Sequence, residues 1–119
     1  MITGIHHLAI SVPDIELAFD FYHRVLGFEK VFNNSWEGDR PQADQVIGLD
    51  ETQAKVWMLK AGNAFLELWE YEHPVPKRKE FDHSAADHGI AHFALQVTDI
   101  HEEYKRLSNN GMTFHAPPV

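Results

Sequence analysis

Two histidines stand at equivalent places in two copies of one sequence pattern. In the first copy a Gly-Ile pair ends two residues before His7, and an Asp-Ile pair begins seven residues after it. The second copy repeats both spacings around His92. An imidazole can ligate a metal, transfer a proton or only form hydrogen bonds, and a single histidine is more often structural. Because they recur at the same position of both copies, these two histidines are the most informative residues about the chemistry of the chain.

Glu67 is the third residue that could do chemistry. It lies in the middle of a predicted strand, and the alternation of that strand puts it on one face with three aromatic residues. An unpaired carboxylate is costly to bury on such a face, so Glu67 needs a partner or a function. The aromatic residues are candidates for the apolar wall of a ligand pocket, and core packing explains each of them equally well: Phe65, Trp69 and Tyr71.

Both histidines lie on predicted strands that have one apolar face and one polar face. His7 shares its face with Ala9 and Ser11, and His92 shares its face with Ala94 and Gln96. His6 falls on the apolar face of the first strand, which predicts a core or interface residue. The polar faces of both strands could therefore line a cavity.

An amphipathic helix is predicted after each of these strands. Asp14 and Asp99 are the expected N-caps, and Gly27 and Gly111 are the expected stops. Because strand and helix recur together, the chain is predicted to consist of two related halves. The sequence also predicts four further strands, over 28–32, 53–59, 64–71 and 112–115. It predicts a turn at 61–63 and a loop over 33–44.

Composition limits the possible partners. The net charge of −8 argues against nucleic acid and against an anionic membrane surface. No apolar run reaches the roughly 20 residues of a membrane-spanning helix, and no secretory signal is visible, so a cytoplasmic location is expected. The absence of cysteine excludes disulfides and thiolate ligands.

The length of 119 residues predicts a single domain. Module one is expected over 4–71, a linker with two prolines and a basic triplet over 72–88, and module two over 89–119. By comparison with the first half, module two lacks two strands, which is roughly 25–30 residues at ordinary strand and loop lengths. Module two is therefore expected to be incomplete at its C-terminus.

The chain resembles the vicinal-oxygen-chelate superfamily, which includes glyoxalases, epimerases, extradiol dioxygenases and bleomycin-resistance proteins. Four stretches carry the resemblance: His7 to Asp14, Phe21-Tyr22 with Leu26-Gly27, Leu66 to Leu68, and His92 to Asp99. The resemblance implies an α+β fold in which paired βαβββ modules form a curled mixed sheet around a cavity. It also implies that members often pair their modules across a dimer, and a homodimer is expected here.

The resemblance implies a divalent metal in that cavity, held by His7, Glu67 and His92. A fourth ligand would lie past Val119 or come from water or another subunit. Imidazole nitrogen and carboxylate oxygen suit Zn²⁺, Ni²⁺, Mn²⁺ or Fe²⁺. His88, just before the second strand, is a further candidate for substrate contact.

The function that this resemblance implies first is a lyase or isomerase acting on a small substrate with vicinal oxygens. A carboxylate, either Glu67 or the missing C-terminal glutamate, would remove a proton next to a carbonyl, and the metal would stabilise the enediolate. An extradiol dioxygenase using Fe²⁺ or Mn²⁺ is the alternative, and the presence of Glu67 favours the lyase or isomerase over it. A metal-free protein that binds an antibiotic is the second alternative.

Overall fold

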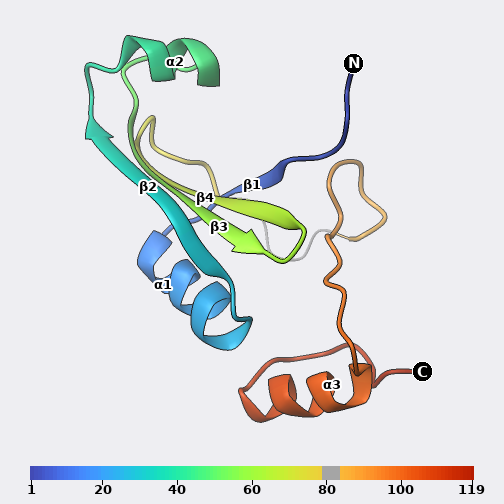
Figure 1. Cartoon of the computed structure of the whole chain (residues 1–119). Helices are drawn as coiled ribbons and strands as arrows, with labels where there is room; N and C mark the ends of the chain where they lie inside the picture. The colour runs from blue at the N-terminus through green and yellow to red at the C-terminus, as the bar shows by residue number, and fades with distance from the viewer. Residues whose placement is uncertain (79–83) are drawn as a thin grey trace. The chain divides into compact units, whose positions relative to one another are not determined.

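The computed structural model describes residues 1–78 and 84–119 (Figure 1). Contacts divide the chain into two units, Met1–Lys77 and Arg78–Val119, and each is described by itself. The predicted linker 72–88 includes residues 79–83, which lie outside the described residues, as does the last member of the basic triplet. The division into two modules joined by a linker stays a prediction.

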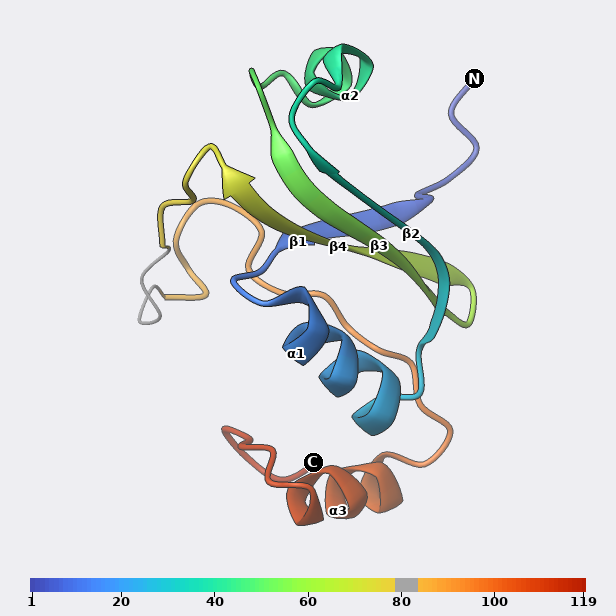
Figure 2. The ribbon, with the colours of Figure 1, turned by 90° about the vertical axis from the view of Figure 1, so that its left-hand side faces the viewer.

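The first unit is built on a four-stranded mixed sheet. Its strands are β1 (His7–Ser11), β2 (Glu29–Glu37), β3 (Gln53–Ala61) and β4 (Ala64–His73), in the spatial order β1-β4-β3-β2. The β1 strand runs parallel to β4, and the other two pairings are antiparallel. Figure 2 shows a curved, open sheet with α1 on one side. The predicted α+β class and βαβββ order of module one are confirmed.

The helix α1 (Ile15–Asp20) connects the parallel strands and continues as a π-helical turn, η1 (Phe21–Val25). Asp14 is the N-cap, as predicted, because its carboxylate accepts a hydrogen bond of 2.9 Å from the backbone N–H of Leu17. Gly27 ends the helical segment at a positive φ of 80°. The core lies between this helix and the sheet, and its buried members are Ile15, Phe28, Leu59, Leu66 and Leu68.

A carboxylate of β4 fixes the start of α1 on the sheet. The backbone N–H of Ile15 donates to Glu70 Oε2 over 2.7 Å, and Lys55 Nζ donates to Glu70 Oε1 over 3.0 Å. The first N–H groups of a helix have no partner inside the helix, so this bond satisfies one of them. Glu70 thus has a structural role on the face that α1 covers.

The predicted loop over 33–44 is wrong. The β2 strand, predicted over 28–32, continues to Glu37, and a short helix, α2 (Pro41–Ile47), follows it. Turn-forming residues such as Asn33 predicted a loop, but β2 pairs with β3 along its whole length and the ladder outweighs this local preference. Proline at the start of α2 and Gly48 at its end are typical helix boundaries.

Three side chains attach α2 to the sheet. Asp44 of α2 accepts hydrogen bonds from the backbone N–H of Thr52, at 3.1 Å, and from its hydroxyl. Trp36 of β2 donates its indole N–H to the Thr52 hydroxyl oxygen over 2.9 Å. Thr52 is fully buried and all its polar groups named here are paired, which meets the usual requirement for a buried polar residue.

The second unit contains one helix within its described residues, α3 (Ile100–Asn109). The side chain of Asp99 accepts hydrogen bonds of 3.1 Å from the backbone N–H groups of His101 and Glu102, so the predicted N-cap is confirmed. Gly111 follows the helix at a positive φ of 85°. Across both units, no described helix is long and apolar enough to cross a membrane.

The strands predicted around His92 and over 112–115 are wrong, because residues 84–119 contain no strand. The apolar residues Phe93, Leu95 and Val97 are 43%, 44% and 41% exposed. A strand is stable only when its backbone groups and one face find partners. The alternating pattern is present in the sequence, but the described residues 84–119 contain no neighbouring strand that would stabilise it.

Acid should weaken the attachment of α2. The hydrogen bond from the Thr52 hydroxyl lowers the pKa of Asp44. The ionised Asp44 carboxylate therefore contributes fully to stability above its pKa in the unfolded chain, about 3.9. This contribution is lost as the pH falls through the lower pKa that Asp44 has in the folded protein. We expect Asp44→Asn to reduce the free energy of unfolding at pH 7, and we expect its difference from the parent protein to become smaller at pH 3, as measured by urea unfolding. Asp50→Asn, an exposed neighbour, is the control; a constant difference between parent and Asp44→Asn at both pH values would contradict this assignment.

Candidate functional site

Parallel pairing of β1 with β4 brings two of the predicted ligands together. His7 lies opposite Phe65 and Ala9 lies opposite Glu67 in the ladder. Side chains at paired positions share a face, so His7 and Glu67 both project from the face opposite α1. This helix-free face carries the residues that the sequence pattern assigned to a cavity.

The donor atoms of these two residues are close but do not form a normal hydrogen bond. His7 Nε2 lies 3.6 Å from Glu67 Oε2, and the side chains are 37% and 17% exposed. A good N–H···O hydrogen bond spans about 2.7–3.2 Å, so this separation is too long for one. The pair is solvent-accessible and has donor atoms available for a further partner.

Glu67 is held by its neighbours on β4. Trp69 donates its indole N–H to Glu67 Oε2 over 2.6 Å. Trp69 also stacks on Tyr71, with ring centroids 5.4 Å apart and planes 8° from parallel. Burial, and secondarily the charge of Glu67, raises the pKa of the Tyr71 phenol. The predicted aromatic wall beside Glu67 therefore includes a direct hydrogen-bond partner of the carboxylate.

His6 lies beside the pair and is not the core residue that was one of its two predicted roles. It is exposed, and its ring stacks on Phe65 with centroids 5.0 Å apart. Its Nδ1 lies 2.8 Å from Nδ1 of His7, so one of these nitrogens donates to the other. Strand alternation predicted a core or interface position, but β1 begins only at His7, so the alternation does not apply to His6. The signal that could have found it is the pair of adjacent histidines.

The chemistry and spacing of the two donors fit a divalent metal ion. Two ligands bound to one ion at about 2.0–2.2 Å with a tetrahedral angle are about 3.3–3.6 Å apart, and His7 Nε2 and Glu67 Oε2 are 3.6 Å apart. Within residues 1–78 and 84–119, no group of three or more His, Cys, Asp or Glu side chains is arranged to hold a metal. The described geometry thus brings two possible ligand atoms together, fewer than a metal site needs.

The other predicted site residues, His88 and His92, belong to the second unit, and both are exposed. Because each unit is described by itself, their membership in a site with His7 and Glu67 stays a prediction.

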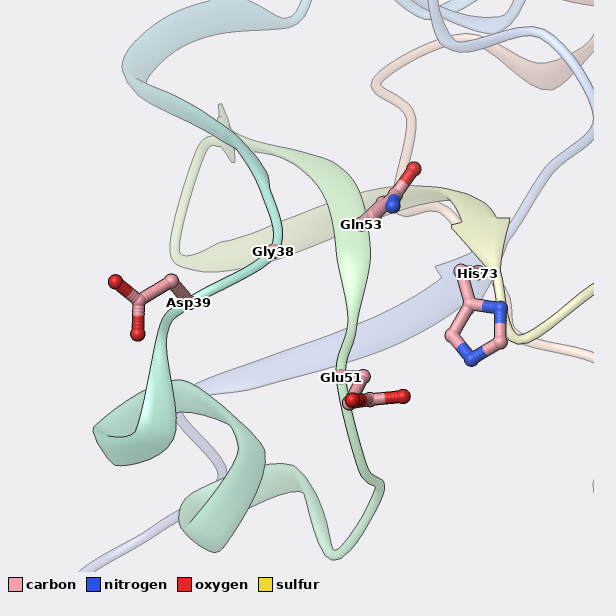
Figure 3. A pocket seen from close by; sticks show the side chains of 5 residues that line it. All are labelled: Gly38, Asp39, Glu51, Gln53 and His73. Carbon is pink, nitrogen blue, oxygen red and sulfur yellow. The ribbon is translucent and has the colours of Figure 1, made fainter.

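A pocket that the sequence did not predict lies where β3 begins and β4 ends. It has a volume of about 290 Å³ and is lined by Gly38, Asp39, Glu51, Gln53 and His73. Figure 3 shows the Asp39 carboxylate pointing away from the other three side chains. His73 is six residues beyond Glu67 on β4, about 20 Å along a strand. This pocket is therefore distinct from the His7–Glu67 pair.

The sequence matches one protein family over nearly its whole length. The family is described as the Glyoxalase/Bleomycin resistance protein/Dioxygenase superfamily, and the match covers residues 4–119. A curated relative, 2-epi-5-epi-valiolone epimerase from an Actinomyces species, is 32% identical over 100 residues. The match covers 82% of this chain and 54% of the relative, so the chain spans about half the length of that enzyme.

Solved structures share the fold. A glyoxalase family protein from Bacillus cereus is similar with a TM-score of 0.72 and 21% identity, over 93% of this chain and 74% of that one. A member of the same superfamily from Sphaerobacter thermophilus is similar with a TM-score of 0.61 and 29% identity, over 99% of this chain and 79% of that one. Together with the curled mixed sheet, these matches confirm the resemblance: the chain belongs to the glyoxalase/bleomycin resistance protein/dioxygenase superfamily.

Proposed function

We propose that this chain supplies part of a divalent-metal-dependent epimerase or isomerase that acts on a small substrate with vicinal oxygens. The observation that carries the proposal is the 3.6 Å separation of His7 Nε2 and Glu67 Oε2, which suits a shared ion better than a hydrogen bond. The similarity to an epimerase favours this reaction over ring cleavage or simple binding.

In this proposal His7 and Glu67 bind the ion together with His92, and a fourth ligand comes from outside the chain. The ion, when bound, supplies a Lewis acid for a carbonyl oxygen of the substrate. The metal is Zn²⁺, Ni²⁺, Mn²⁺ or Fe²⁺, since all accept imidazole and carboxylate ligands.

Epimerisation next to a carbonyl requires removal of a proton and its return to the opposite face of the carbon. A carboxylate is a suitable base for this transfer. Glu67 is the candidate on this chain, and a glutamate from outside this chain is the other. Phe65, Trp69 and Tyr71 form an aromatic surface beside Glu67 that would exclude water from the substrate, and His88 is proposed to contact the substrate as well.

The metal site is tested by titrating the metal-free chain with Zn²⁺ or Mn²⁺ in a calorimeter. We expect His7→Ala and Glu67→Ala each to weaken binding by at least about tenfold, because each removes a ligand. His101→Ala, an exposed histidine of α3, is the control and should bind like the parent. If both ligand variants bind as tightly as the parent, the proposed metal site fails and the metal-free binding protein takes its place.

The reaction is tested with 2-epi-5-epi-valiolone in D₂O, using NMR to follow the epimer and deuterium incorporation next to the carbonyl. We expect Glu67→Gln to lower the rate by about 10²–10⁴-fold, because it removes either the base or a ligand of the Lewis acid. Glu72→Gln, an exposed glutamate of β4, is the control. Turnover without deuterium incorporation would contradict proton transfer, and oxygen uptake on catechols by the iron-loaded protein would favour the dioxygenase.

Assembly is the third part of the proposal. The strands β1 and β2 form the edges of the first unit's sheet, and the apolar residues Phe93, Leu95 and Val97 of the second unit lack strand partners among the described residues. We propose that two copies pair to complete both sheets, because unpaired strand edges and apolar faces favour association. Sedimentation equilibrium should give twice the chain mass at micromolar concentration. A single species with the mass of one chain would contradict the homodimer.

A further inference from the structure

Glu67 differs from an ordinary surface carboxylate because an aromatic side chain holds one of its oxygens. The Trp69 indole N–H donates to Glu67 Oε2 over 2.6 Å. An indole N–H is only a donor, so the direction of this hydrogen bond does not depend on a tautomer. The oxygen that it contacts is the same one that lies 3.6 Å from His7 Nε2.

Trp69 itself has little freedom to move. Its ring stacks on Tyr71 with centroids 5.4 Å apart, and the ring of Trp36 meets it edge-on at 5.9 Å. Val56, its partner across the β3–β4 ladder, is buried with 5% of its surface exposed. Aromatic packing of this kind fixes both the place and the direction of the indole N–H.

The contacts continue away from the site. Trp36 is held in turn by its own indole N–H, which donates to the buried Thr52 hydroxyl over 2.9 Å. Thr52 hydrogen-bonds to Asp44 of α2. The position of Trp69 is therefore supported from the sheet and from the helix that follows β2.

The geometry points to Trp69 as the positioning residue for the Glu67 carboxylate in metal binding. This inference rests on the proposed function of Glu67. A glutamate side chain has three rotatable bonds, and ordering it around an ion carries an entropic penalty. The Trp69 hydrogen bond orders the carboxylate beside His7 before the ion arrives, and the carboxylate keeps further lone pairs for the ion. Partners of this kind commonly contribute 10–100-fold to metal affinity.

The test uses Trp69→Phe in the full chain, which keeps an aromatic ring between Tyr71 and Trp36, although a smaller one, and removes the indole N–H. We expect Zn²⁺ affinity, measured by calorimetry with Zn²⁺ alone, to fall by about 10–100-fold. The matched control is Trp57→Phe, because Trp57 lies on the helix-covered face against Phe19. That variant should bind Zn²⁺ like the parent.

A second readout follows the indole N–H groups directly by ¹H–¹⁵N NMR, since the three tryptophans of the chain give three indole signals. The Trp69 signal should shift in Glu67→Gln and on addition of Zn²⁺, while the Trp57 signal stays in place. This measurement needs no folded Trp69 variant and no activity.

The outcomes separate the two proposals. If the Trp69 signal ignores both Glu67→Gln and Zn²⁺, or if Trp69→Phe binds Zn²⁺ like the parent while His7→Ala does not, the positioning role of Trp69 is overturned. If His7→Ala and Glu67→Ala leave Zn²⁺ binding unchanged, the proposed metal site itself is overturned, whatever the signal of Trp69 does.

Discussion

The parallel pairing of β1 with β4 is the interaction on which the rest of the first unit depends. It joins segments almost sixty residues apart and sets His7 opposite Phe65 and Ala9 opposite Glu67. Parallel strands need a crossover, and α1 provides it while covering the apolar face of the sheet. A shift of this ladder by one residue would move His7 to the helix-covered face and remove it from Glu67. One register therefore determines both the core and the candidate site.

Two glutamates on β4 show how the faces divide their roles. Glu70 lies toward α1, where the Ile15 N–H and the Lys55 ammonium group occupy its oxygens. Glu67, three residues earlier, lies on the other face beside His7 and Trp69. The first carboxylate is used to hold the helix. The second lies among aromatic side chains and keeps lone pairs for the ligand role that we propose for it.

The second unit has the sequence pattern of a module but not its strands. Its helix forms because a helix satisfies its own backbone groups and Asp99 caps it locally. A strand depends on a neighbour for its hydrogen bonds, and the described residues 84–119 provide none. The chain also spans only about half of its epimerase relative. The proposed metal site therefore depends on groups from outside the first unit.

The sequence by itself determined the family, the fold class and the local elements whose signals are short-range. The N-caps at Asp14 and Asp99, the glycine stops and the β3–β4 hairpin depend on nearby residues, and all of them were predicted. The sequence also selected His7 and Glu67 as residues of interest. The sequence wrongly predicted a loop over 33–44, because local turn preferences do not include the hydrogen-bonded ladder with β3 that extends β2. It also assigned His6 to the apolar face of the first strand, although β1 begins only at His7, because the start of β1 is set by pairing.

Only the tertiary structure decided which of the candidate residues meet. The 3.6 Å approach of His7 to Glu67 and the contact of His6 with Phe65 follow from the β1–β4 register. The Trp69 hydrogen bond could not be read from the spacing of two residues on one strand, because it depends on how Tyr71 and Trp36 orient the indole. Periodicity gives the face on which a side chain lies. Contacts between strands distant in sequence give the partner, since the ladder alone fixes which positions stand side by side.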